Sequence, residues 1–170
     1  QIDDKYNPIN VAGCPPDYFS ADGQKWGHPL YDFEEMKKDN YKYLINRYLD
    51  ANKKFDVVRI DHFRAFDSYF KIPIDKSAQE GFYEEGPSYA LFDELFKSTS
   101  SDKFVVEDLG SELEETIKLR DYYDFMGMKV LQYTLDGEKD NYSEKENMLV
   151  YTGNHDNDTI VGWYNKFDNK

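Results

Sequence analysis

Hydrophobic residues along the chain follow two patterns, helical spacing and short apolar runs. From Phe33 to Lys54 they recur at helical spacing, which predicts an amphipathic helix. The same spacing predicts helices at residues 89–96, 112–121 and 159–166. Short apolar runs, rich in β-branched and aromatic residues, predict strands at residues 55–60 and 103–106, within 125–133, and at 148–151.

The alternation of predicted strands and helices indicates an α/β fold with a parallel sheet and right-handed crossovers. Residues 11–33 contain many Gly and Pro residues with little periodicity, so they predict a long loop, and their aromatic content indicates a functional one. No repeat or linker divides the chain, so we expect one unit over residues 1–170. A full (β/α)8 barrel needs about 250 residues. The chain therefore predicts a partial TIM (β/α)8 barrel with roughly half of the strands.

Three acidic residues follow predicted strands at nearly regular intervals. They are Asp61, Glu107 and Asp156. This spacing suits successive strands of a β/α barrel, whose active site gathers residues from the C-terminal ends of several strands. Three converging carboxylates, with His62 and His155 beside two of them, are groups suited to cleaving a glycosidic bond.

The net charge and the aromatic content of the chain indicate which class of ligand it could bind. The net charge of −13 argues against a nucleic-acid partner, because phosphate binding needs clustered Lys and Arg. The 15 Tyr, 12 Phe and 2 Trp residues suit a neutral sugar, whose apolar faces stack on aromatic rings, although most of these rings are expected in the core.

The cysteine content and the hydropathy of the chain indicate the cellular compartment in which the protein is expected. Cys14 is the single cysteine, so no internal disulfide forms, which fits a reducing cytoplasm. No stretch approaches the roughly 20 apolar residues of a membrane span, so we expect no membrane partner.

The run from His155 to Asp158 has an alternative interpretation as a metal cluster. Calcium loops need several oxygen ligands at regular spacing, however, and no metal is expected.

Several segments together carry a family resemblance. They are Val11-Ala-Gly-Cys-Pro-Pro-Asp-Tyr-Phe-Ser20, Arg59-Ile-Asp-His-Phe-Arg64, Val106-Glu-Asp-Leu-Gly110, Gly127-Met-Lys-Val-Leu-Gln132 and Asn154-His-Asp-Asn-Asp158. In these segments the sequence resembles the 4-α-glucanotransferases (amylomaltases, disproportionating enzymes, glycoside hydrolase family 77) of the α-amylase clan. The resemblance extends from about residue 11 to residue 164. The resemblance implies a piece of the catalytic barrel of a longer, monomeric cytoplasmic enzyme that needs no cofactor. The start at Gln1, without an initiator Met, agrees with such a piece.

The resemblance assigns a role to each carboxylate. Asp61 is expected to be the nucleophile, and Arg59, on the same face of its strand, to hold it ionised, although the two residues could equally form a structural ion pair. Glu107 is expected to be general acid and then general base. That double role requires a pKa raised by burial or by the other two carboxylates. Asp156 is expected to bind sugar hydroxyls and help distort the ring.

Further residues are expected to bind the substrate. His62 and His155 would donate to sugar hydroxyls. Trp26 would be a stacking platform and Gln24 a polar contact, on a loop over residues 21–31 that covers the glucan. The remaining expected contacts are Asp17, Asp108 and Tyr133; the last lies where relatives usually carry Phe.

The implied reaction transfers a segment of an α-1,4-glucan to the 4-hydroxyl of glucose or a maltooligosaccharide, with retention of configuration. An α-glucan hydrolase of the same clan is the near alternative, since sugar and water compete for one intermediate. A non-catalytic glucan-binding fragment and a purely structural protein are alternatives from other classes. The oligomeric state of the isolated chain is left open.

Overall fold

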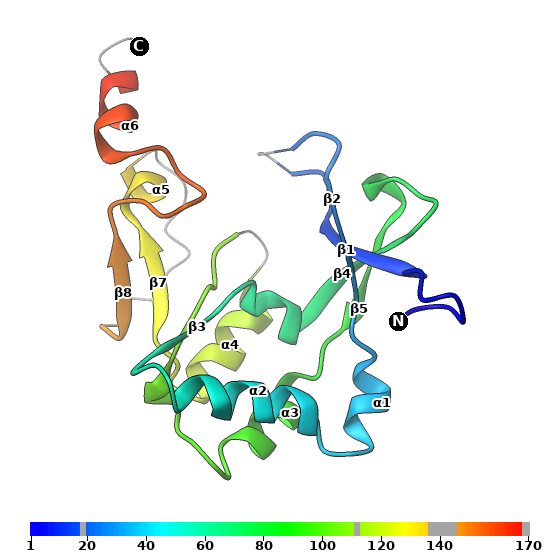
Figure 1. Cartoon of the computed structure of the whole chain (residues 1–170). Coiled ribbons are helices and arrows are strands. Elements are labelled where there is room, and N and C mark those ends of the chain that lie inside the picture. The colour runs from blue at the N-terminus through cyan, green and yellow to red at the C-terminus, as the bar shows by residue number, and fades with distance from the viewer. Residues whose placement is uncertain (18–19, 111–112, 136–145, 168–170) are drawn as a thin grey trace. The chain divides into compact units, whose positions relative to one another are not determined.

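The computed structural model describes residues 1–17, 20–110, 113–135 and 146–167, and its elements form two compact units (Figure 1). The first unit contains Gln1–Asp56 and Phe63–Ser100. The second contains Val57–His62 and the chain from Ser101 onward. The second unit is therefore discontinuous in sequence, because residues 63–100 belong to the first.

An antiparallel sheet of four strands dominates the first unit, in the order β2-β1-β4-β5. The strands are β1 (Asn10–Cys14), β2 (Gln24–Pro29), β4 (Ser68–Pro73) and β5 (Phe82–Glu85). Gly13 is required where β1 approaches β2, because a Cβ there would lie 2.0 Å from the carbonyl oxygen of Gln24. Val11, Phe70 and Ile72 pack with Ala78 into a small core on this sheet.

Among its described residues, the first unit also contains three α-helices and two short 3-10 helices. They are α1 (Phe33–Lys37), α2 (Lys42–Asn52), η1 (Phe63–Phe66), η2 (Ala78–Glu80) and α3 (Ser88–Leu95). The single helix predicted over residues 33–54 is wrong, because α1 and α2 are separate. Asn40 and Tyr41 have φ angles of 56° and 57°, in the left-handed region that a right-handed helix cannot pass through. Buried Tyr41 anchors this break, and α2 and α3 lie side by side (Figure 1).

The second unit is built from parallel strands. They are β3 (Val58–Ile60), β6 (Phe104–Val106), β7 (Gly127–Val130) and β8 (Met148–Tyr151). β3 pairs with β6 and β7 pairs with β8, both in parallel. A parallel bridge between Val105 and Met126 links β6 to the start of β7. All three residues of β6 are buried, as expected for a strand covered on both faces.

Helices alternate with these strands in the second unit. They are η3 (Ser101–Lys103), α4 (Glu114–Tyr122), α5 (Leu131–Leu135) and α6 (Ile160–Phe167). Because the strands are parallel, their carboxyl ends lie at one edge of the sheet, and the three acidic segments follow three of these ends. Among the described residues the sheet is open and does not close into a barrel.

The predicted α/β alternation is confirmed, and the predicted elements near residues 89–96, 103–106, 148–151 and 159–166 agree with the structure to within one residue. The long loop predicted over residues 11–33 is wrong, because it contains β1 and β2. All six residues of β2 are exposed, so this strand carries no hydrophobic alternation. The predicted buried strand at 55–60 is shorter and more exposed than expected: Phe55 is 63% exposed and lies outside β3. Residue 112, the predicted start of a helix, lies outside the described residues.

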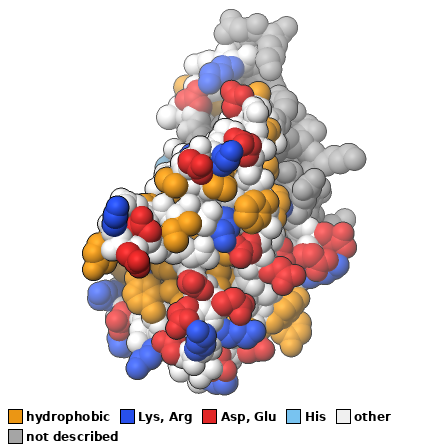
Figure 2. Space-filling model, turned by 90° about the vertical axis from the view of Figure 1, so that its right-hand side faces the viewer, with side chains coloured by type: hydrophobic (Ala, Val, Ile, Leu, Met, Phe, Trp, Pro, Cys, Tyr) orange, Lys and Arg blue, Asp and Glu red, His pale blue; other side chains and the backbone are white. Residues whose placement is uncertain are grey.

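Charged groups of both signs share the surface. On the face seen in Figure 2, acidic side chains are interspersed with Lys and Arg and with hydrophobic side chains. Several oppositely charged neighbours form exposed ion pairs, such as Lys118 with Glu115 on α4. In the described ranges, no helix is both long and apolar enough to cross a membrane.

Candidate active site

Arg59 and Asp61 form an ion pair at the carboxyl end of β3. The guanidinium Nη2 lies 2.7 Å from Oδ1 of Asp61. The two side chains share a face because they are two residues apart on an extended chain, so the predicted pair is present. The Asp61 side chain is 73% exposed, and the charge-assisted bond orients it without covering it.

Glu107 follows β6, the strand beside β3. Its backbone N–H donates to the carbonyl oxygen of Ile60, which continues the ladder between the two strands (2.9 Å). Its carboxylate Oε2 accepts the backbone N–H of His62 at 2.7 Å. His62 has a φ of 46°, a conformation that costs a non-glycine residue roughly 1–2 kcal/mol. This strained turn directs the N–H after the nucleophile candidate toward Glu107.

The surroundings of Glu107 change its acidity. Burial is the largest cause and raises the pKa of its carboxyl to about 7, and the negative charges of Asp61 and Asp108 act in the same direction. The His62 N–H and the Arg59 guanidinium lower the pKa in part. The predicted rise toward neutrality is confirmed, but Asp108 takes the place expected for Asp156 as the second carboxylate responsible.

Asp108 is held inside the protein. Its Oδ2 accepts from Arg120 Nη1 at 2.6 Å, and its Oδ1 accepts the backbone N–H of Met128 at 2.9 Å. The side chains of Asp108 and Arg120 are fully buried. Arg120 also donates from Nε to Asp121. These contacts give Asp108 a structural role, and its expected contact with sugar stays a prediction.

A short turn after β8 carries His155 and Asp156. The side chain of Asn154 accepts the backbone N–H of Asp156 at 2.8 Å, and the side chain of Asn157 accepts that of Asn154 at 3.1 Å. His155 Nε2 lies 3.4 Å from Asp156 Oδ2, and both side chains are well exposed. The turn thus presents the third carboxylate to solvent. Within the described part of the chain, His, Cys, Asp and Glu side chains form no group of three that could hold a metal ion.

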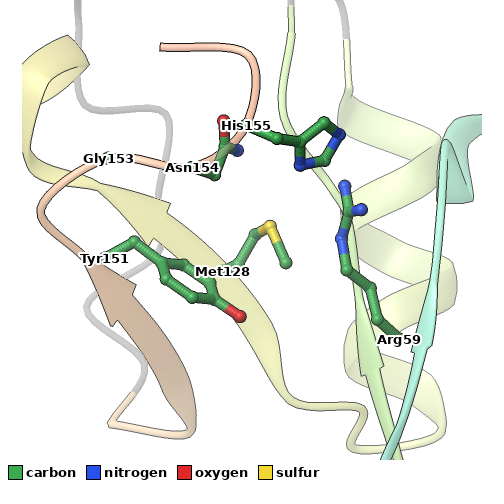
Figure 3. Close-up of a pocket in the computed structure, with 6 residues that line it drawn as sticks. All are labelled: Arg59, Met128, Tyr151, Gly153, Asn154 and His155. Carbon is green, nitrogen blue, oxygen red and sulfur yellow. The ribbon is translucent and has the colours of Figure 1, made fainter. Parts of the chain in front are cut away.

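A pocket of about 260 Å³ opens at this edge of the sheet. Its lining residues are Arg59, Met128, Tyr151, Gly153, Asn154 and His155 (Figure 3). The Arg59 guanidinium and the His155 ring point toward each other, beside the Met128 side chain (Figure 3). Ligand pockets usually measure about 300–1,000 Å³, so this space suits one part of a larger ligand.

Sequence reasoning missed Met128, Tyr151, Gly153 and Asn154 as pocket residues. Tyr151 is the last residue of β8, so the rule that sites gather at the carboxyl ends of parallel strands could have found it. Met128 lies inside β7, where an apolar residue looks like ordinary core. Tyr133, which was predicted to bind sugar, lies half-buried in α5, directly after β7.

The remaining predicted binding residues belong to the first unit. Trp26 and Gln24 lie on β2, not on a loop, and Trp26 Nε1 donates to Gln24 Oε1 at 3.1 Å. The indole is 40% exposed and stacks on the His28 ring. Asp17 is exposed, and its side chain accepts the backbone N–H of Ser20. The exposed indole offers a flat apolar face of the kind that binds a sugar ring.

The family model, the related sequences and the solved structure that match this chain are all described as 4-alpha-glucanotransferases or amylomaltases. The family model described as 4-alpha-glucanotransferase matches residues 2–170. The 4-alpha-glucanotransferase of Streptococcus pneumoniae is 44% identical over 159 residues, which cover 91% of this chain and 32% of that protein. The Thermus thermophilus 4-alpha-glucanotransferase is 40% identical over 170 residues (96% and 34%). The structure of amylomaltase from Streptococcus agalactiae in complex with acarbose matches with a TM-score of 0.88 at 33% identity, over 96% of this chain and 34% of that one. The chain spans about a third of the length of these relatives.

Proposed function

The chain belongs to the 4-alpha-glucanotransferase family, and from this premise we propose that it forms part of an enzyme that transfers segments of α-1,4-glucans. Both units are then parts of one catalytic domain, and the parallel strands belong to a (β/α)8 barrel of which the chain supplies about half. Support comes from the parallel pairing of β3 with β6 and of β7 with β8, with the acidic residues at the carboxyl ends.

The observation that carries the proposal is the contrast between two neighbouring carboxylates. Asp61 is exposed and paired with Arg59, whereas Glu107 is half-buried and has a pKa of about 7. Two carboxylates whose environments differ in this way suit the separate roles of nucleophile and acid. A retaining enzyme would hold the two carboxyl groups about 5–5.5 Å apart.

In the first step, a carboxylate oxygen of Asp61 attacks the anomeric carbon of the donor glucan. The glycosidic C–O bond breaks, and protonated Glu107 donates its proton to the departing oxygen. The donor segment is then held as an ester on Asp61, and the other part of the glucan leaves with a free 4-hydroxyl.

In the second step, the 4-hydroxyl of an acceptor replaces the departed segment. Glu107, now ionised, takes the hydroxyl proton while the oxygen attacks the anomeric carbon and Asp61 is released. Two inversions give net retention. Asp156 and His155, on the exposed turn after β8, bind hydroxyls of the sugar during both steps.

The pocket suits one glucose ring of such a substrate. Met128 and Tyr151 offer apolar surface, while Arg59 and His155 offer hydrogen-bond donors. We take the donor to be an α-1,4-glucan and the acceptor to be glucose or a maltooligosaccharide. The Streptococcus agalactiae amylomaltase in complex with acarbose supports this choice. A cytoplasmic location belongs to the same proposal, supported by the single cysteine.

Incubation with maltotriose tests the function. The protein used is the product of the complete reading frame that encodes this chain, and products are resolved by chain length. We expect glucose together with maltopentaose and longer chains, because two maltotrioses exchange a maltosyl unit. Glucose and maltose alone would identify a hydrolase. Asp61→Asn is the control, and unchanged turnover in that variant would exclude the mechanism.

A further inference from the structure

Gln132 lies behind the turn that carries Asp156. It is the second residue of α5 and is only 4% exposed. Its Nε2 donates to the carbonyl oxygen of Thr152 at 3.0 Å and to that of Asp158 at 2.8 Å. These carbonyls lie at the two ends of the segment 153–157, so a single amide group holds both ends.

The contact between Gln132 and this segment is close. A Cβ on Gly153 would lie 2.5 Å from Gln132 Nε2, so the glycine lets the backbone rest against the amide. Inside the segment, Asn154 and Asn157 complete the turn through their own side chains. The turn is therefore shaped locally, whereas Gln132 attaches it to the carboxyl end of β7.

The chemistry of the side chain matters here. The two N–H groups of a Gln amide can serve two carbonyl oxygens at once. An ionised Glu has the same length but no donor, and Met has neither a donor nor a charge. Among neutral side chains of this length, only Gln satisfies both carbonyls.

We propose that Gln132 is a positioning residue for Asp156. Its amide ties both ends of the segment 153–157 and so sets where Asp156 and its neighbour His155 meet the sugar. Figure 3 shows Gly153, Asn154 and His155, three residues of this segment, at the pocket. This inference rests on the proposed function, since it assigns Asp156 to sugar binding.

A double-mutant cycle on the complete reading-frame product tests the inference. Turnover of an activated aryl maltotrioside is measured for the unchanged protein, Gln132→Met, Asp156→Asn and the double variant. Misplacing a catalytic-site group by 1 Å can cost on the order of 100-fold, so Gln132→Met should lower kcat by about 10- to 100-fold. In the Asp156→Asn background, the same change should lower kcat less than about threefold, because residues that act as a unit are not additive.

The matched control is Gln79→Met in the first unit. Gln79 is exposed, and its Nε2 donates to Asp22, so kcat should be unchanged. Equal losses from Gln132→Met in both backgrounds would overturn the positioning role and leave a structural one. An unchanged kcat in Gln132→Met would also overturn it. If Asp156→Asn is fully active, or if the unchanged protein transfers nothing, the proposed function itself fails.

Gln132→Glu keeps the inference testable if the Met variant does not fold. A protonated Glu can donate one hydrogen bond and an ionised one none. The ratio of variant to unchanged kcat should therefore fall as pH rises from 5.5 to 8. A ratio that stays constant over this range would contradict the proposal.

Discussion

At the scale of single residues, position on a strand does not set the chemistry of a carboxylate. Asp61 and Glu107 each follow the last residue of neighbouring parallel strands. Asp61 is exposed and paired with a guanidinium, whereas Glu107 is half-buried and accepts a backbone N–H. The N–H that Glu107 accepts comes from the strained turn at His62, directly after Asp61.

Transfer should depend on the protonation of Glu107. As general acid it must carry its proton, and it does so below its pKa of about 7. We therefore expect kcat/KM to fall as pH rises through about 7. A profile from pH 5 to 9 with maltotriose would show this alkaline limb. A rate that stays flat up to pH 9 would contradict the assignment of Glu107 as the acid.

Removing the charge of Asp61 should lower the pKa of Glu107, because that charge raises it. In Asp61→Asn the Glu107 carboxyl should titrate at lower pH than in the unchanged protein, yet still above 4.5, since burial is the larger cause. Carbon-13 NMR of labelled glutamate would measure this without requiring activity. Glu115→Gln, on the exposed side of α4, is the control and should leave the titration unchanged.

Local spacing explains which site residues could be predicted. The Arg59–Asp61 pair follows from the two-residue period of a strand. The roles of Asp108 and Gln132 could not be predicted in this way. Asp108 pairs with Arg120 on α4 and with a backbone N–H of β7, and Gln132 binds two backbone carbonyls after β8. Contacts between distant segments leave no periodic signal in the chain.

At the scale of elements, one buried ion pair joins three of them. Asp108 follows β6, Arg120 lies on α4, and Met128 lies on β7. The carboxylate binds both partners with no side-chain surface exposed. This pair therefore helps align β6 with β7, and with them Glu107 and the pocket.

Arg120→Met should destabilise the protein strongly. It leaves Asp108 as a buried charge without its cation, which typically costs about 3–5 kcal/mol. Urea unfolding of the 170-residue chain would measure the change in the free energy of unfolding. Lys118→Met on the same helix is the matched control, because its ion pairs are exposed and contribute little to stability. Similar losses in both variants would contradict the importance of the buried pair.

Helices and parallel strands were easier to predict than the antiparallel sheet. α3 and α6 have clear apolar periods, and β8 is a short apolar run. β1 and β2 lie among Gly and Pro residues, and β2 buries none of its side chains, so neither has the pattern of a half-buried strand. β4 and β5 lie between the predicted strand at 55–60 and the predicted helix at 89–96, where no strand was predicted. Their pairing depends on distant partners, such as Ile72 with Val11.

At the scale of the whole molecule, the net charge of −13 remains although some acidic side chains pair with Lys, as on α4. The proposed substrate is neutral, so long-range steering does not contribute to its capture. The large charge instead favours solubility and discourages contact with nucleic acid.

Salt should therefore have little effect on transfer. Between 50 and 500 mM NaCl, kcat/KM for maltotriose should change by less than about twofold, because screening acts on charge–charge encounters. A parallel series uses sucrose at the same osmotic strength as the salt. It separates the effect of ionic screening from the effect of a lower water activity. A steep fall with salt would point to a charged substrate.

The insertion of residues 63–100 into the second unit has a kinetic consequence. β3 can pair with β6 only after the intervening chain, which belongs to the first unit, brings its ends together. Closing such a loop lowers the conformational entropy of the chain before the contacts between the strands form and offset this loss. Pairing between distant segments therefore slows folding. The burial of Glu107 and its bond from His62 both arise with this pairing. During refolding, Glu107 thus begins as an ordinary glutamate and acquires its altered acidity in the step that docks β3.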